Sequence, residues 1–124
     1  MRGTIPSAIG IMYKQRQIVL VPFPYSDLSS TKRRPVLIVS NDSYNGNFDD
    51  VPVCVITSNL RKDEYSVTLS DDDLEIGVLP ESSVVKSHKL FTIHKDKIIK
   101  TFSLVKAEFF DRVNEKIENL IKAG

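Results

Sequence analysis

The fold is decided by residues 32–40, which read Lys32-Arg33-Arg34-Pro35-Val36-Leu37-Ile38-Val39-Ser40. Nearly every side chain from Pro35 onward is apolar, so residues 35–40 predict a strand buried on both faces, by its own fold or by a partner. The proline fixes the backbone just after the two arginines. An arginine held there is more ordered than one on a free loop, and its planar fork of donors matches the oxygens of a phosphate. Two solvated arginines ahead of a strand are the alternative.

Further strands are predicted on both sides of this stretch, at residues 17–21, 51–58, 65–70, 78–93 and 97–102. Pro22-Phe23-Pro24 closes the first of them, and the long segment 78–93 is expected to bend near His88. Residues 24–34 read as a polar loop of the length that binding loops and lids have. Residues 41–50 read as turn and loop, with Asn45-Gly46 as the signal.

The C-terminal segment changes to helical spacing. Apolar side chains recur at Phe109, Val113, Ile117, Leu120 and Ile121, with charged residues between them, which predicts an amphipathic helix capped by Ser103 or a neighbour. About six short strands in meander order and one covering helix indicate a mostly β protein. The expected fold is a small antiparallel β-barrel, closed or half-closed, with a C-terminal helix.

The 124 residues fit one domain, and the net charge of +1 excludes a protein that is basic all over. The charges are nevertheless uneven, because residues 32–34 and 86–100 are basic while residues 49–50 and 71–73 are acidic. A nearly neutral protein can present one positive face to a polyanion. Solvated loops are the other reading of such runs.

The single cysteine, Cys54, lies in an apolar run and excludes a disulfide within the chain. This suits a reducing compartment, and no stretch approaches the roughly 20 apolar residues that span a bilayer or forms a signal peptide. We therefore expect a cytoplasmic protein without a membrane segment. Residues 1–13 have no clear pattern and are interpreted as an N-terminal extension, with a single domain at residues 14–124.

Two further positions carry polar chemistry. Thr57 lies near the end of the strand 51–58. If Val53, Val55 and Thr57 share a face, the Thr57 hydroxyl continues that row, where it could bind a phosphate oxygen or orient an attacking group. A hydroxyl bonded to a neighbouring loop is the alternative. Lys86 and His88 are two residues apart and share a face, which pairs a proton-transfer side chain with a cation.

Other chemistries find little support. His88 and His94 have no acidic or cysteine companion at ligand spacing, so no metal site or cofactor is predicted. Motifs of serine hydrolases, P-loops and dinucleotide binders are absent from the sequence. Asp71-Asp72-Asp73 lacks the spacing of a calcium loop and reads as a solvated turn.

Several segments in one order resemble a known family. They are Gln17-Ile18-Val19-Leu20-Val21-Pro22-Phe23-Pro24, the stretch 32–40, Ile56-Thr57-Ser58, Ser83-Val84-Val85, Leu90-Phe91-Thr92-Ile93 and the amphipathic C-terminal helix. Together they resemble the MazF/PemK toxins of type II toxin–antitoxin systems over residues 15–122. The resemblance implies an SH3-like barrel of the plasmid-toxin type that forms a homodimer. It also implies a metal-independent endoribonuclease that cuts single-stranded RNA at short sequences and is neutralised by a cognate antitoxin.

The resemblance also implies roles for residues. The arginine that precedes proline corresponds to Arg34 and the threonine of the following strand to Thr57, as the catalytic pair for attack of a ribose 2′-hydroxyl on phosphate. Arg34 would stabilise the pentacoordinate phosphate and protonate the leaving oxygen, with Thr57 positioning the phosphate. His88 is a third catalytic candidate, and RNA contacts are assigned to Lys32, Arg33, Ser58, Arg61, Lys86 and Lys89.

The sequence departs from the family pattern at two places. Arg16-Gln17 stand where many members carry Gly-Asp, which affects a turn more than chemistry. His88 stands where some members place an acidic residue, with a basic residue two positions before it, here Lys86.

The expected partners are a second copy of the chain and an antitoxin whose acidic, flexible segment lies across Arg34. Both expectations rest on the apolar stretch 35–40 and the basic runs. Two other functions stay open: a non-catalytic toxin of the same fold that docks a helix on a protein target such as gyrase, and an inactive barrel that binds RNA or a peptide.

Overall fold

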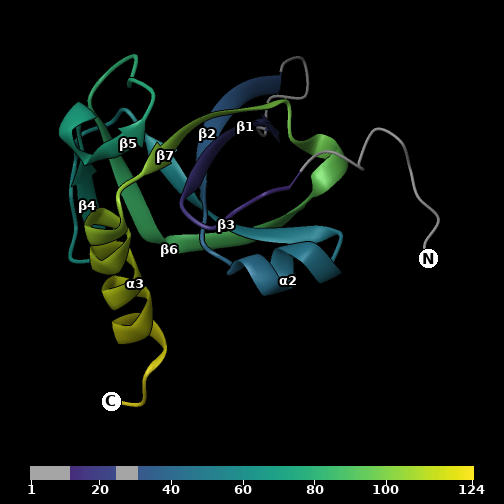
Figure 1. The fold of residues 1–124 in the computed structure, drawn as a ribbon. Coiled ribbons are helices and arrows are strands. Elements are labelled where there is room, and N and C mark those ends of the chain that lie inside the picture. Colours follow the sequence, from purple (N-terminus) through teal and green to yellow (C-terminus); the bar gives the residue numbers. More distant parts are fainter. Residues whose placement is uncertain (1–11, 25–30) are drawn as a thin grey trace.

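A curled antiparallel sheet with one long helix against it forms the body of the protein (Figure 1). The structure, a computed structural model, describes residues 12–24 and 31–124. The strands are β1 (Gln17–Pro24), β2 (Thr31–Ile38), β3 (Asp50–Thr57), β4 (Ser66–Leu69), β5 (Leu74–Ile76), β6 (Ser83–His94) and β7 (Lys100–Val105). The helices are α2 (Asp42–Asn47) and α3 (Ala107–Ile121), with short 3-10 turns at Asp71–Asp73 and Lys95–Lys97.

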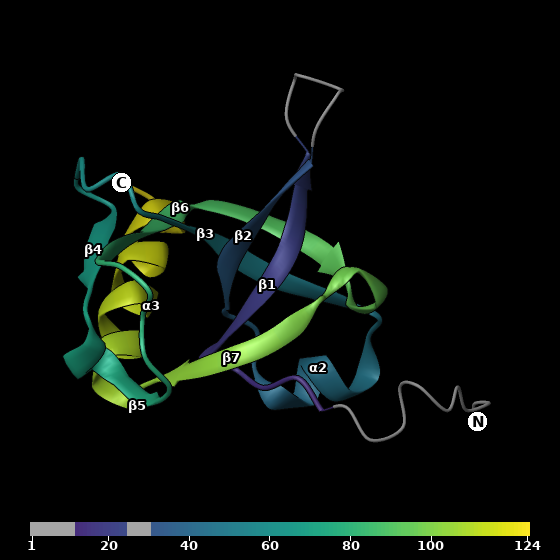
Figure 2. The same ribbon diagram turned by 90° about the horizontal axis from the view of Figure 1, so that it is seen from above.

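The seven strands form one sheet in the order β4-β6-β3-β2-β1-β7-β5. Every pairing in it is antiparallel. The predicted mostly β fold with a C-terminal helix is confirmed, as a half-barrel whose edges are β4 and β5. The predicted meander order is wrong beyond β3, because β6 rather than β4 pairs with β3 and β7 returns to pair with β1 (Figure 2).

The central strands β1 and β2 bury side chains on both faces of the sheet. Alternation along β1 sends Ile18 into one apolar cluster and Val19 into another, and β2 divides Leu37 from Val36 in the same way. We call the first the helix-side cluster, because it contains Phe109, Phe110 and Val113 of α3. We call the second the inner cluster; it contains Val19, Val21, Val36, Ile38, Val51 and Val53, and Tyr13 packs against it. The stretch 35–40 is therefore covered on both faces by its own fold, so its pattern no longer argues for a partner. Tyr13 is the last residue of the expected N-terminal extension, whose residues 1–11 lie outside the described part of the chain.

The predicted C-terminal helix is confirmed as α3. Phe109, Phe110 and Val113 are buried in the helix-side cluster, and each such side chain contributes about 1.5–3 kcal/mol to the free energy of unfolding. The apolar stripe of α3 thus covers the core, which leaves less of it for docking on a target. The N-cap is Lys106 and not Ser103, because Ser103 is buried inside β7.

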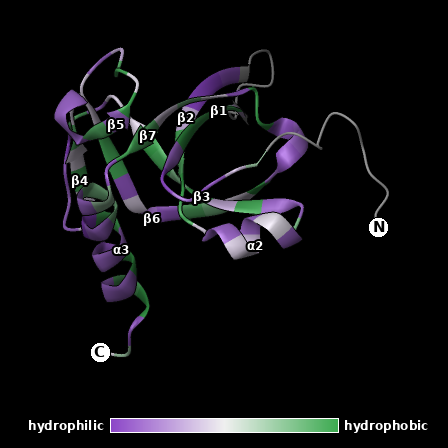
Figure 3. Cartoon of the chain, viewed as in Figure 1, coloured by the Kyte–Doolittle hydropathy of each residue, from purple (hydrophilic) through white to green (hydrophobic). Residues whose placement is uncertain are grey.

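Several boundaries differ from the sequence prediction. β2 begins at Thr31, so Lys32, Arg33 and Arg34 belong to the strand and not to the predicted loop 24–34, of which residues 25–30 lie outside the described part. Figure 3 accordingly shows a hydrophilic end on β2 and hydrophobic residues along β1. Residues 78–82 precede β6 and are not strand, whereas β7 runs over Lys100–Val105 rather than over 97–102.

Two elements were not predicted. α2 replaces the expected turn at 41–50, because the Asn41 side chain caps the helix by accepting from the Tyr44 N–H at 2.8 Å. Its Gly46 lies in open space and needs no unusual backbone angle there. β5, only three residues long, pairs with β7 at the sheet edge and was hidden by the acidic run before it.

A bulge bends β6 at its middle. Cys54 of β3 pairs with Leu90, but the next residue, Val55, pairs with Lys86, so residues 87–89 have no counterpart on β3. The predicted bend near His88 is therefore confirmed. Cys54 itself is fully buried, as its apolar run predicts, and burial raises the pKa of its thiol to about 12.

Candidate functional site

The register of β2, β3 and β6 brings the predicted catalytic residues together. Leu37 pairs with Cys54 and Val36 with Val55. Arg34 and Thr57, each two residues away along its strand, point to the same side of the sheet as Val36 and Val55. Arg34 and Thr57 therefore share the face of the inner cluster, beyond the last buried valines.

On this face the sheet carries a polar hollow of about 540 Å³. We call it the basic groove; it is lined by Arg34, Val55, Thr57, Asn59, Arg61, Asp63, Lys86, His88 and Lys89. Four of these side chains are permanent cations, and only Asp63 is acidic. Six residues assigned to the site from the sequence thus line one groove: Arg34, Thr57, Arg61, Lys86, His88 and Lys89. A groove with this excess of positive charge is suited to a polyanion.

The hydroxyl of Thr57 is held by the chain that leaves β3. Thr57 Oγ1 accepts a hydrogen bond from the Asn59 N–H at 3.1 Å, and Asn59 Oδ1 accepts from the Arg61 N–H at 3.1 Å. The loop contact that the sequence left as an alternative therefore exists. It uses one lone pair of the hydroxyl, so the O–H itself remains able to donate into the groove.

Lys86 ties the segment between β3 and β4 to β6. Its Nζ donates to the Arg61 carbonyl oxygen at 2.8 Å, to Ser66 Oγ at 3.1 Å and to Asp63 Oδ2 at 3.4 Å. Its side chain is only 12% exposed. All three donors of the ammonium are therefore occupied, which makes Lys86 an anchor of the groove wall.

Asp63 is the residue of this site that the sequence analysis missed. Its Oδ1 accepts from the Tyr65 N–H and from Ser66 Oγ, both at 2.9 Å. Desolvation alone would raise the pKa of Asp63, but the hydrogen bonds from Ser66, Tyr65 and Lys86, together with the Lys86 charge, lower it. Asp63 stands in a charged run that reads as a solvated loop. The signal that marks it is a serine three residues later, which is typical of a side chain that organises a turn.

His88 lies beside Asp63 on the bulge of β6. Its Nε2 is 3.8 Å from Asp63 Oδ2, and its ring lies 5.8 Å from the Tyr65 ring at 48°. Its side chain is 29% exposed and lines the groove. The bulge thus places an imidazole and a carboxylate from different segments side by side.

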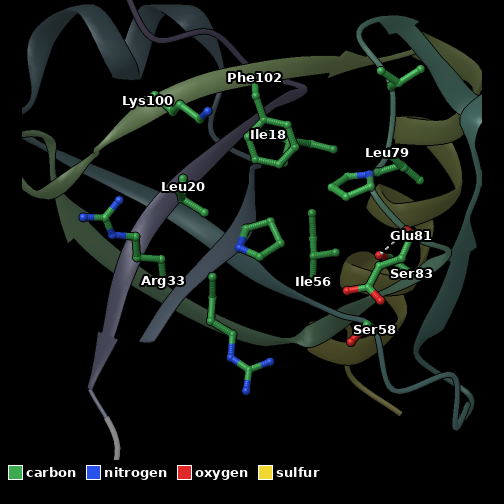
Figure 4. A pocket seen from close by; sticks show the side chains of 14 residues that line it. Ile18, Leu20, Arg33, Ile56, Ser58, Leu79, Glu81, Ser83, Lys100 and Phe102 are labelled. Carbon is green, nitrogen blue, oxygen red and sulfur yellow. Dashed lines mark hydrogen bonds between the residues drawn. The ribbon is translucent and has the colours of Figure 1, made fainter. Parts of the chain in front are cut away.

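A second hollow of about 430 Å³ lies on the helix-side face (Figure 4). We call it the apolar pocket; its walls include Ile18, Leu20, Pro35, Ile56, Leu79, Pro80 and Phe102. Arg33 and Ser58, both assigned to RNA binding, line this pocket and not the groove, and Arg34 lines both. Lys32 is exposed near the start of β2 and lines neither hollow.

The other chemistries considered from the sequence concern metal binding, His94, the acidic run 71–73 and a membrane span. Within residues 12–24 and 31–124, no group of three or more His, Cys, Asp or Glu side chains could hold a metal ion. His94 Nδ1 accepts from the Asp96 N–H at 3.1 Å, away from the groove. Asp73 pairs with Arg112 of α3 at 3.2 Å. No helix in the described part of the chain is both long and apolar enough to cross a membrane.

The fold is shared with known toxins. The matched chain in the MazE–MazF crystal structure from Deinococcus radiodurans is 21% identical with a TM-score of 0.74, covering 90% of this chain and 97% of that one. An endoribonuclease solved with its cognate antitoxin, from a mycobacterial species, is 19% identical with a TM-score of 0.73, covering 90% and 99%. The Mycobacterium tuberculosis toxin MazF-mt6 is 25% identical with a TM-score of 0.68, covering 84% and 94%. These matches show that the chain has a MazF-like fold.

The sequence places the chain in a family. A family profile described as "PemK-like, MazF-like toxin of type II toxin-antitoxin system" matches residues 14–121. The chain belongs to this PemK/MazF family, as the resemblance predicted. A search of curated protein sequences finds no match.

Proposed function

We propose that this toxin is a metal-independent, sequence-specific endoribonuclease that cuts single-stranded RNA in the cytoplasm and thereby blocks translation. The observation that carries the proposal is that Arg34 and Thr57 line one groove, whose described lining residues include four cations and one carboxylate. Similar folds include proteins described as endoribonucleases.

The reaction is attack of a ribose 2′-hydroxyl on the adjacent phosphorus. The O2′–P bond forms, the P–O5′ bond breaks, and the products are a 2′,3′-cyclic phosphate and a 5′-hydroxyl. The 2′-hydroxyl proton leaves to solvent, and the O5′ oxygen takes up a proton from solvent as the P–O5′ bond breaks. DNA lacks the nucleophile and is not cut.

Arg34 and Thr57 act on the phosphate. Negative charge grows on the non-bridging oxygens as phosphorus becomes pentacoordinate, and a guanidinium aimed at them stabilises that charge. An arginine does not lose its proton in a protein, so Arg34 supplies charge and hydrogen bonds rather than the proton for the leaving oxygen. The free O–H of Thr57 donates to the phosphate and fixes its place in the groove.

The apolar pocket supports a polynucleotide as the ligand. An RNA strand offers anionic phosphates and flat, apolar-faced bases along one chain, and the protein offers a cationic groove and an apolar pocket joined at Arg34. Phe102, Pro35 and Pro80 present rings on which a base can pack. Arg33, Ser58 and Glu81 supply polar groups at the same pocket, which suits the reading of base edges.

Two partners complete the proposal. The groove attracts an acidic, flexible antitoxin segment by the same charge that attracts RNA, and similar folds have been solved with a cognate antitoxin. A homodimer is supported by exposed apolar side chains at Ile76, Val78 and Ile99, near the β5–β7 edge of the sheet. Light scattering at micromolar concentration should give twice the monomer mass. A monodisperse monomer would refute the proposed homodimer.

The decisive experiment is incubation with a long RNA of defined sequence in excess chelator, followed by mapping of the new ends. We expect cleavage at a short recurring sequence with cyclic phosphate ends. Arg34→Ala should lower the rate by about 10²–10³-fold, the effect of losing one preorganised donor. Arg112→Ala is the matched control, because Arg112 is an exposed arginine on α3 away from the groove. Equal rates for Arg34→Ala and the wild type would refute the assignment.

A further inference from the structure

Asp63 lies between Lys86 and His88, two of the side chains of β6 that line the groove. Its Oδ2 is 3.4 Å from Lys86 Nζ and 3.8 Å from His88 Nε2. The carboxylate comes from the segment between β3 and β4, so the contact joins that segment to the bulge of β6.

The carboxylate is held in place and ionised. Its other oxygen, Oδ1, accepts two hydrogen bonds from Tyr65 and Ser66, which fix the torsion of the side chain. Three hydrogen-bond donors and the Lys86 charge keep the pKa of Asp63 low, as described above. His88 therefore faces a fixed negative charge on the side of its Nε2.

The two ring nitrogens of His88 have different surroundings. Nδ1 is buried, and no described residue offers it a hydrogen-bond partner. A proton on Nδ1 would be a buried donor without an acceptor among the described residues, which disfavours the tautomer that carries it. A proton on Nε2 lies instead on the side of the groove and the Asp63 carboxylate. Because the 3.8 Å between Nε2 and Asp63 Oδ2 is too long for a hydrogen bond, this N–H remains able to donate into the groove.

We propose that Asp63 is a positioning residue that keeps His88 as the neutral tautomer with its proton on Nε2, so that His88 donates a hydrogen bond to phosphate. This inference rests on the proposed function for its substrate. It changes the role expected for His88 from acid or base to hydrogen-bond donor. A base would need a lone pair at an accessible nitrogen, and in this tautomer the only lone pair is on the buried Nδ1.

The groups facing His88 agree with this role. Lys86 and Lys89 of β6, Arg34 of β2 and Arg61 of the neighbouring segment contribute positive charge to the groove. Within residues 12–24 and 31–124, Asp63 is the one acidic side chain that lines it. Tyr65 packs its ring against the imidazole. The cations attract the phosphate into the groove. There the neutral His88 ring contributes a hydrogen bond from its N–H and adds no further positive charge.

Nitrogen-15 NMR of the histidine rings tests the tautomer without RNA. The chain has two histidines, and His94 is an internal standard, because its Nδ1 accepts from the Asp96 N–H and its neutral ring must carry the proton on Nε2. At a pH of about 8, we expect His88 to give the same pattern of ring shifts as His94. Asp63→Ala should move His88 toward a mixture of tautomers, whereas Glu64→Ala, which removes the neighbouring exposed carboxylate, should not.

The outcomes are decisive in either direction. A proton on Nδ1 in the wild type would overturn the inference, and so would an unchanged Nε2–H pattern in Asp63→Ala. In the cleavage assay, His88→Gln keeps a donor near the Nε2 position without acid or base capacity. We expect it to cut RNA about 10²-fold faster than His88→Ala, the lower end of the effect of losing one preorganised donor.

Equal loss of activity in the two His88 variants would indicate proton transfer and refute the donor role. The proposed function fails separately, if wild-type protein leaves RNA intact in chelator. In that case the NMR result still decides whether Asp63 positions His88.

Discussion

Replacing Lys86 by methionine removes the ammonium that joins β6 to the segment between β3 and β4. The variant keeps the length and packing of the stem, so the change tests the polar contacts alone. Three hydrogen bonds are lost, to Arg61, Asp63 and Ser66. We expect the free energy of unfolding to fall and the groove wall to loosen.

The magnitude follows from the exposure of the partners. A hydrogen bond to a charged group contributes about 1.5–3 kcal/mol. The Asp63 side chain is 46% exposed, and Arg61 is exposed as well, so both regain water when the ammonium is gone. We therefore count the hydrogen bond to Ser66 alone, and expect the free energy of unfolding to fall by about 2 kcal/mol. At about 4 °C per kcal/mol for a chain of this size, Tm should drop by about 8 °C.

Thermal and urea unfolding followed by circular dichroism measure the loss. The matched control is Lys89→Met, which removes the same charge from an exposed position of the same groove. Surface substitutions of that kind change stability by less than about 0.5 kcal/mol. If the two variants unfold at the same temperature, Lys86 does not anchor the segment and the reasoning fails.

Further predictions concern Thr57, Asp63, Phe109 and Cys54. Thr57→Ala should slow RNA cleavage less than Arg34→Ala does, while Thr57→Ser should restore the rate, as measured with one RNA at a single salt concentration. Because the folded-state pKa of Asp63 is lowered from 3.8, its contribution to stability is fully present above that pH and is lost as the pH falls through the folded-state pKa. The stability difference between wild type and Asp63→Asn in urea should therefore shrink in acid, and a constant difference would contradict this. Phe109→Ala should cost about 3–5 kcal/mol in urea unfolding, because Phe109 is almost completely buried. Cys54 should react with a thiol reagent only on unfolding, because it is buried and burial raises its pKa to about 12; rapid labelling of the folded protein would refute its burial.

The elements that the sequence predicts well are those whose pattern is local. α3 follows from apolar side chains at helical spacing, and β3 from a continuous apolar run that ends at Thr57. The curled sheet was predicted as a class but not in its strand order, because β6 and β7 pair with strands far away in the chain. Nothing within a strand's own sequence specifies so distant a partner.

The site shows the same division. Arg34, Thr57, Lys86 and His88 were chosen by residue type and position, and the structure sets them around one groove. Asp63 was missed because its role depends on the fold of the segment 58–65 over β6. Arg33 and Arg34 are adjacent in sequence, but the face of a strand alternates, and only a known register assigns Arg34 to the groove.

The bulge of β6 divides that strand into two halves with opposite phase. Before it, Val85 faces the helix-side cluster and Lys86 the groove; after it, Phe91 and Ile93 pack on the inner cluster. The three extra residues change the alternation of side chains between the two faces by an odd number. Deleting one of them would therefore exchange the faces of the side chains in one half of the strand. The bulge thereby lets one strand line the groove with Lys86 before it and pack Phe91 and Ile93 on the inner cluster after it. Of residues 84–89, Val84, Val85 and Ser87 are buried, so the groove positions His88 and Lys89 are the ones that can vary while the length of the bulge is preserved.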